Sequence, residues 1–166
     1  MAMKNLKIGT WISLFILSLF SFSAFAGKGV IVNVDVPGMS FQAKTSKLKG
    51  SVKKEGDVYK ADKLYVKVKS LKTEMDLRDE HLRDKLEYKK HSKIVVSQGV
   101  AKGGKGKAII EIKGVKKPIN FSYQESGGLF IAKFPLSLKD FGITGISYMG
   151  LGVKDKVVVE ASVPIK

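Results

Sequence analysis

The sequence contains no cysteine, so neither disulfides nor thiolate metal sites can stabilise the fold, and a lipid anchor on cysteine is excluded. Arginine is nearly as scarce, because Arg78 and Arg83 are the only arginines among 30 basic residues. Proteins that read nucleic acids rely on arginine for bidentate contacts with bases and phosphates, and no nucleic-acid-binding motif is present. Nucleic acid is therefore not an expected partner.

Residues that commonly carry catalysis or bind metals are also few. The only histidines are His81 and His91. His81 lies near Asp79, Glu80 and Asp84, but no second histidine follows four residues later, so we expect a structural role rather than a metal site. A Gly-x-Ser-x-Gly nucleophile motif does not occur, and no carboxylate pair stands out from the surface charge. The sequence predicts no catalytic residues, no metal site and no enzymatic activity.

The first 26 residues have the pattern of a secretory signal peptide. Lys4 and Lys7 form a basic start, residues 8–22 form an apolar stretch, and Ala24-Phe25-Ala26 is a small-x-small cleavage site. The apolar stretch is short for a membrane span, which needs about 20 residues. We therefore predict cleavage after Ala26, a mature domain at 27–166, and a periplasmic or secreted location.

The formal net charge is +15, and all but two of the 30 basic residues are lysines. The lysines are spread over many segments, so an ordinary solvated surface is the first explanation. The alternative is attraction to an anionic membrane surface or to an acidic polymer of the cell envelope.

Most of the predicted mature domain alternates between apolar and polar residues, as half-buried strands do. The segments 30–36, 64–69, 119–123 and 157–163 show this alternation clearly. Such segments recur at intervals of roughly 10 residues, separated by turn residues, which is typical of an antiparallel sandwich or barrel. We predict an all-β fold, an antiparallel barrel of about eight strands.

One segment, residues 71–85, departs from this pattern because it is dense in both acids and bases. Leu71 and Met75 are four residues apart, as are Leu82 and Leu86, which fits one face of a helix. Ion pairs within the segment are expected to hold its arginines. The segment therefore predicts one short helical insertion that lies near the mouth or wall of the barrel.

Four motifs, in order along the chain, resemble those of the YceI-like family. Residues 78–83 resemble its R-D-x-H-L-R/K motif, and residues 112–119 resemble its G-V-T-K-P turn. Residues 138–143 resemble its R-S-D-F-G-I segment, and residues 152–157 its V-G-D-E-V entry to the last strand. The sequence departs from the family where Thr45 replaces a histidine.

Members of this family are bacterial envelope proteins with a lipocalin-like barrel that bind polyisoprenoid lipids, so the resemblance implies that fold and an apolar ligand. We expect Arg78 to hold the helical segment against the turn at 140–142. The residues expected to form the structural motif are Arg78, Asp79, His81, Leu82, Arg83, Asp140, Phe141 and Gly142.

The predicted function is that of a secreted or periplasmic protein that sequesters or carries a long apolar ligand, polyisoprenoid, quinone-like or acyl. Each buried CH₂ would contribute about 0.8 kcal/mol. The alternative is a barrel with a filled core, an interaction protein whose lysines bind anionic envelope components. No cofactor is expected other than an isoprenoid or quinone-type lipid as ligand. The oligomeric state is left open, with a dimer among the options.

The residues expected to line the ligand chamber are inward-facing members of the predicted strands. They are Phe41, Val66, Val68, Ile94, Val96, Ile110, Ile112, Phe121, Tyr123, Phe130, Ala132, Phe134, Leu136, Val157 and Val159.

Overall fold

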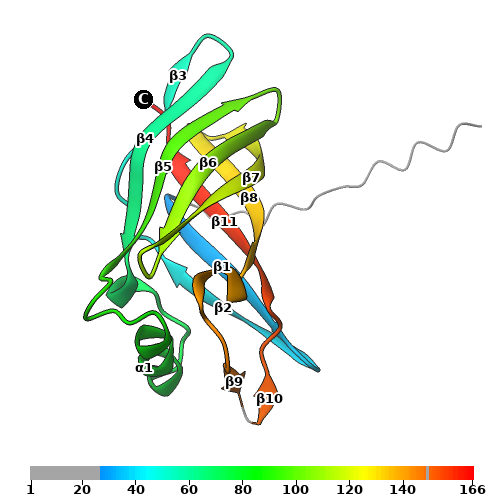
Figure 1. Ribbon diagram of the computed structural model, residues 1–166. Helices are drawn as coiled ribbons and strands as arrows, with labels where there is room; N and C mark the ends of the chain where they lie inside the picture. Colours follow the sequence, from blue (N-terminus) through cyan, green and yellow to red (C-terminus); the bar gives the residue numbers. More distant parts are fainter. Residues whose placement is uncertain (1–26, 149) are drawn as a thin grey trace, which may run out of the picture.

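Nine antiparallel strands curl into an elongated barrel in the computed structural model, which describes residues 27–148 and 150–166 (Figure 1). The order of the strands in the sheet is β2-β1-β11-β8-β7-β6-β5-β4-β3. The all-β prediction is confirmed, with nine strands in the sheet rather than about eight. The strands are β1 (Gly29–Val36), β2 (Met39–Thr45), β3 (Lys53–Glu55), β4 (Val58–Lys67), β5 (Lys93–Lys102), β6 (Lys105–Ile112), β7 (Val115–Ser126), β8 (Leu129–Ser137) and β11 (Lys156–Pro164).

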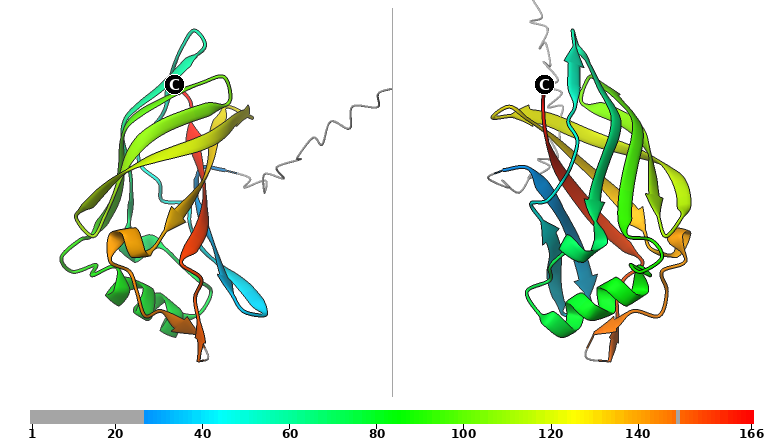
Figure 2. Two further views of the ribbon diagram at one scale, coloured as in Figure 1. Left: turned by 45° about the vertical axis from the view of Figure 1, so that its right-hand side comes forward. Right: turned by 90° about the vertical axis from the view of Figure 1, so that its left-hand side faces the viewer.

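The remaining elements gather at one end of the barrel, which we call the helix end (Figure 2). They are the helix α1 (Asp76–Lys85), the 3₁₀ turns η1 (Val68–Ser70) and η2 (Lys139–Phe141), and a small hairpin of β9 (Ser147–Tyr148) and β10 (Leu151–Gly152). The C-terminus and the β3–β4 hairpin lie at the opposite end. None of the helices in the described residues is long and apolar enough to cross a membrane.

The two edges of the sheet are joined by the chain segment 44–54, which closes the barrel. Lys44 and Lys72 exchange both backbone hydrogen bonds, as do Lys49 and Tyr65 on β4. Farther along, the Val52 N–H donates to the Pro164 carbonyl beside the end of β11. These bonds satisfy backbone groups that would otherwise be left open at the sheet edges.

The closing segment depends on Gly50. Its φ of +107° lies in a region that residues with a Cβ rarely adopt, and a Cβ there would stand 2.6 Å from the Lys63 carbonyl oxygen. We expect Gly50→Ala to lower the free energy of unfolding by about 2 kcal/mol, since the neighbouring backbone must shift. Chemical denaturation measures this. Gly56→Ala is the control: Gly56 has a φ of +63° and no neighbour within 4 Å, so equal losses would contradict a clash at Gly50.

The helix is shorter than the predicted segment 71–85. Leu71 is buried but extended, Glu74 has a φ of +66°, and the N-cap Met75 is also extended. The helix therefore begins at Asp76, and the interpretation of Leu71 and Met75 as one helical face is wrong. Leu71 instead packs in the barrel core directly after η1.

At the opposite end the interior is closed by aromatic rings. The Phe130 ring stacks on Tyr123 with 4.5 Å between centroids and packs against Tyr59 at 5.1 Å. The Tyr59 hydroxyl donates to the carboxylate of Glu125, which also pairs with Lys54 at 2.7 Å. Hydrogen bonds from Lys54 and Tyr59 hold the pKa of Glu125 below its usual value. The rings of Tyr59, Tyr123 and Phe130 therefore fill much of the interior at this end.

Candidate ligand cavity

Two cavities follow one another along the inside of the barrel. Alternate residues of the same strands line both: on β1, Val30 lines the inner cavity and Val32 the helix-end cavity. On β11, Val159 lines the inner cavity and Val157 the helix-end cavity. Because side chains of equal parity point the same way along a strand, the two cavities lie in line.

The inner cavity has a volume of about 130 Å³ and an almost wholly apolar lining. This is below the roughly 300–1,000 Å³ typical of small-molecule sites, because rings of Phe121, Phe130 and Phe134 crowd the space. Most of the residues expected to line a chamber are brought together here: Val66, Ile94, Val96, Ile110, Ile112, Phe121, Phe130, Ala132, Phe134, Leu136 and Val159.

The other four predicted lining residues lie elsewhere. Phe41 and Val157 line the helix-end cavity. Val68 is almost fully buried in the packed core at 1% exposure and lines neither cavity. Tyr123 stacks against Phe130 and is likewise absent from both linings. Val68 lies just beyond β4, at the start of η1, and Tyr123 has inward parity on β7, but both side chains meet other side chains rather than empty space.

The helix-end cavity is much larger, with a volume of about 730 Å³. One wall is the β1–β2 hairpin, and α1 and the segment 143–153 form the others. The hairpin contributes Val32, Val34, Phe41 and Ala43, the helix contributes Leu77, Arg78, His81, Leu82 and Lys85, and the later segment contributes Ile143, Gly145, Ile146, Ser147 and Val153. The helical segment was expected near the mouth or wall, with Arg78, His81 and Leu82 as residues of a structural motif rather than of the ligand site. The lining from 143–153 was not predicted. The apolar residues Ile143, Ile146 and Val153 in a glycine-rich loop were the available signal.

Arg78 ties α1 to the wall of this cavity. Its guanidinium lies 4.1 Å from the centre of the Phe41 ring, a cation–π contact between α1 and β2. It also donates to the Thr73 carbonyl at 3.5 Å and to the Met75 sulfur at 2.8 Å. The expected pairing with Asp140 is not among the contacts that the structure describes for either residue.

Lys113 contacts the turn at 140–142. Lys113 Nζ donates to the Gly142 carbonyl at 3.3 Å and pairs with Glu87 at 2.9 Å. Phe141 is buried in the core, and Gly142 ends η2 with a φ of +64°. Farther on, Lys85 of α1 donates to the Thr144 carbonyl at 2.9 Å and so joins the helix to the third wall.

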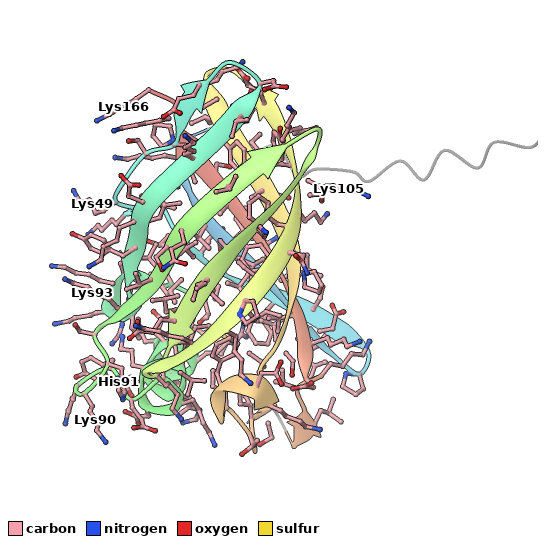
Figure 3. All side chains as sticks on the ribbon, turned by 45° about the horizontal axis from the view of Figure 1, so that its top comes forward. Lys49, Lys90, His91, Lys93, Lys105 and Lys166 are labelled. Atoms are coloured by element: carbon pink, nitrogen blue, oxygen red, sulfur yellow. The ribbon has the colours of Figure 1, made fainter. Side chains whose placement is uncertain are left out.

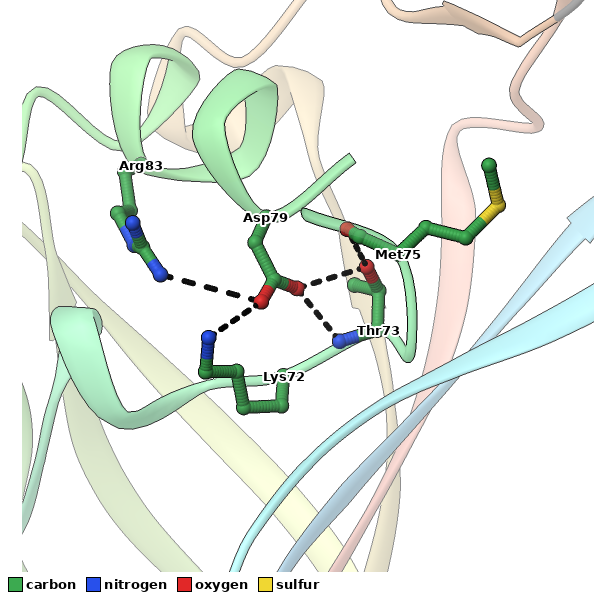
Figure 4. A network of polar contacts seen from close by, with 5 residues as sticks. All are labelled: Lys72, Thr73, Met75, Asp79 and Arg83. Atoms are coloured by element: carbon green, nitrogen blue, oxygen red, sulfur yellow. Dashed lines mark hydrogen bonds and ion pairs between the residues drawn. The ribbon is translucent and has the colours of Figure 1, made fainter. Parts of the chain in front are cut away.

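Asp79 anchors the helix from its buried side (Figure 4). Its carboxylate accepts hydrogen bonds from the Thr73 backbone N–H at 2.7 Å and the Thr73 hydroxyl at 2.8 Å. Lys72 pairs with it at 2.8 Å, and Arg83, one turn along the helix, lies 3.8 Å away. Burial by itself would raise the pKa of Asp79, but the hydrogen bonds from Lys72 and Thr73 outweigh it and hold the pKa below its usual value.

This network gives stability a pH dependence. Because the folded-state pKa of Asp79 is depressed, its contribution is fully present above the unfolded-state pKa of about 3.9 and declines as the pH falls through the folded-state pKa. We expect the stability difference between wild type and Asp79→Asn to be constant from about pH 5 to 8 and to shrink below about pH 4. Urea unfolding at stepped pH measures it. A difference that grows on acidification would contradict the depressed pKa.

His81 is exposed and lines the helix-end cavity rather than a buried network. Within the residues that the structure describes, no three or more His, Asp and Glu side chains gather as a metal site would require.

A family model of the YceI-like domain matches residues 28–165, nearly the whole described chain. The chain belongs to the YceI-like family. The expected resemblance is thus confirmed over all nine strands of the sheet and over α1. A comparison with curated protein sequences finds no match.

Three solved structures share the fold of this YceI-like protein at low sequence identity. BcnA of Burkholderia cenocepacia is 16% identical, with a TM-score of 0.60 over 80% of this chain and 94% of its own. A polyisoprenoid-binding domain from Saccharophagus degradans, implicated in plant cell wall breakdown, is 15% identical, with a TM-score of 0.55 over 81% of this chain and 91% of its own. The YceI protein of Campylobacter jejuni is 20% identical, with a TM-score of 0.51 over 95% of this chain and 98% of its own.

The YceI-like cavities have the chemistry to enclose an apolar chain that carries one polar end. Their walls are aliphatic and aromatic along the barrel, and the polar lining groups cluster at the helix end, where Arg78, His81 and Lys85 come from one face of α1. A tail can be desolvated within the walls while a head group meets these side chains.

Proposed function

We propose that this protein binds a long apolar lipid of the polyisoprenoid, quinone-like or acyl class. Its tail lies along the barrel, and its polar end lies at Arg78, His81 and Lys85. The observation that carries the proposal is the cavity of about 730 Å³ at the helix end, in line with a second apolar cavity. The description of the Saccharophagus degradans domain as polyisoprenoid-binding supports the same ligand class.

Affinity would come from burial of the tail. Each CH₂ removed from water contributes about 0.8 kcal/mol, so a tail of several isoprene units needs no charged contact inside the barrel. The helix-end cavity, at about 730 Å³, lies in the range of roughly 300–1,000 Å³ typical of small-molecule sites. Deeper entry into the inner cavity of about 130 Å³ requires the rings of Phe121, Phe130 and Phe134 to move apart. The proposal includes no catalytic step.

The proposed role is carriage or sequestration outside the cytoplasm. The basic start, apolar stretch and Ala-Phe-Ala end of residues 1–26 support export, although these residues lie outside the described structure. A barrel with a wholly filled core, the alternative, is disfavoured by the volume at the helix end.

Native mass spectrometry of the full chain expressed with its leader and purified from the cell envelope tests the proposal. We expect a bound lipid mass that disappears after organic extraction, and a rise in the melting temperature when a long polyprenyl alcohol is added back. A short prenol with the same hydroxyl head group is the control and should give a much smaller rise, since it buries fewer CH₂ groups. Consistently empty protein with no rise for either compound would overturn the proposal.

A further inference from the structure

Four lysines surround Tyr65 on the outer face of β4. Lys63 and Lys67 stand two residues before and after Tyr65 and therefore share its face. Lys49 is the direct backbone partner of Tyr65 in the closing segment, and Lys93 Nζ lies 4.8 Å from the centre of its ring. We call these four residues the lysine face. In Figure 3, the labelled Lys49 and Lys93 point outward from the same side of the barrel.

The lysine face carries more positive than negative charge: Asp62, next to Lys63 on β4, is the one exposed acid directly beside its four lysines in the sequence. All four lysines are exposed, and none belongs to an ion pair found in the described part of the chain. The neighbouring acids Glu55 and Asp57 are already paired, with Lys60 and Lys102 respectively. The adjacent strand β5 contains no acidic residue, and the one acid of β6, Glu111, is paired with Lys116.

The fold also holds like charges opposite one another here. Lys67 on β4 is in direct register with Lys93 on β5, and like charges in that position destabilise a sheet. A hydrophobic or acidic residue at either position would remove the repulsion. An external anionic surface would also relieve it.

We propose that the lysine face docks on an anionic lipid bilayer. Lysine is a compact, strongly hydrated point charge, so a group of lysines suits a diffuse charged surface better than the bidentate recognition of single phosphates that arginine favours. The face also lies on the same side of the molecule as α1, which forms one wall of the helix-end cavity, as the right-hand view of Figure 2 shows for β4 and β5. Docking would therefore bring the helix end near the lipid.

This inference goes beyond the proposed function. Docking needs no lipid inside the barrel, so either proposal can fail while the other stands. The test is flotation of the protein with vesicles of phosphatidylcholine alone or with 30% phosphatidylglycerol. We expect binding only to the anionic vesicles, at low salt, with loss at about 0.5 M NaCl as screening shortens the range of the charges.

Two triple variants with reversed charges show which face binds the anionic vesicles. Lys49→Glu/Lys67→Glu/Lys93→Glu should lower partitioning onto anionic vesicles by about a hundredfold or more. Lys105→Glu/Lys107→Glu/Lys156→Glu removes the same formal charge from exposed positions elsewhere, Lys105 lying on the opposite side in Figure 3, and should retain most of the binding. The first variant reverses both members of the Lys67–Lys93 pair, so repulsion across the pair, and with it the melting temperature, should change little.

Three outcomes would overturn the proposal. One is an equal loss in both triple variants, which would mean that only net charge matters. Another is equal binding to neutral and anionic vesicles. The third is polyglutamate binding as tightly as the vesicles at the same salt, which would assign the face to an acidic polymer. Polyprenyl alcohol binding in solution, measured on the same variants, should stay unchanged and so separates docking from ligand binding.

Discussion

Replacing Asp79 by alanine is expected to lower the free energy of unfolding by about 3–5 kcal/mol. The Asp79 side chain is 3% exposed, and its removal leaves the Thr73 backbone N–H and hydroxyl without their acceptor in a buried position. It also frees Lys72 and Arg83 from their shared partner. Domains of this size are stable by about 5–15 kcal/mol, so the loss is a large share of the total.

Two further variants identify the cause of this loss in stability. Asp79→Asn keeps an oxygen for Thr73 but loses the charge, so a smaller loss of about 1–2 kcal/mol is expected. Glu80→Ala changes an exposed acid beside it on the same helix and should alter stability by less than about 0.5 kcal/mol. Guanidinium unfolding of all three measures the series. A Glu80→Ala loss as large as that of Asp79→Ala would show that the helix, and not the buried network, is sensitive.

The same network explains why one helix can serve two purposes. Its inner side carries Asp79, which fixes the helix to the segment before it, and the neighbouring Arg78 and Leu82 line the helix-end cavity. A wall built from a single ten-residue helix would otherwise be mobile, because short isolated helices are marginal in water. The charge of this segment thus has a structural use, while its position gives it a place at the site.

The strands of the barrel were predictable because their signal is local. Val34 and Ala43 alternate with polar neighbours, and the structure buries both. Parity says which face of a strand is inward, but it does not say whether an inward side chain meets empty space or another side chain. Tyr123 shows the difference, since it has inward parity on β7 and lines neither cavity.

The features that could not be predicted depend on contacts between distant segments. The helix-end cavity is bounded by Ile146 and Val153, which lie in a loop without periodicity and reach the site only because the hairpin β9–β10 folds back toward α1. Arg78 contacts the ring of Phe41, 37 positions earlier in the sequence, and no local rule predicts that contact. Closure by segment 44–54 depends likewise on pairing with residues 65, 72 and 164.

The second large effect concerns ligand binding and follows from the lining of the helix-end cavity. Ala43 is buried on β2, opposite Val32, and lines the helix-end cavity. We expect Ala43→Trp to weaken binding of a long polyprenyl alcohol by about a hundredfold, because an indole ring that excludes about four CH₂ groups removes roughly 3 kcal/mol. Ala43→Leu, which fills less of the space, should give an intermediate loss. Titration followed by melting temperature or native mass spectrometry measures the series.

Gln42→Trp supplies the matched control, since Gln42 is the preceding residue on the same strand and is exposed on the other face. It should bind the polyprenyl alcohol as wild type does. Trp11 is the only natural tryptophan and lies in the predicted leader, so in the processed protein each introduced indole reports its own surroundings. Emission from Ala43→Trp should be blue-shifted relative to Gln42→Trp. Its wavelength should change on addition of the polyprenyl alcohol at concentrations high enough to overcome the weakened binding. Wild-type affinity in Ala43→Trp, with the indole shown to be buried, would mean that the ligand does not occupy the helix-end cavity.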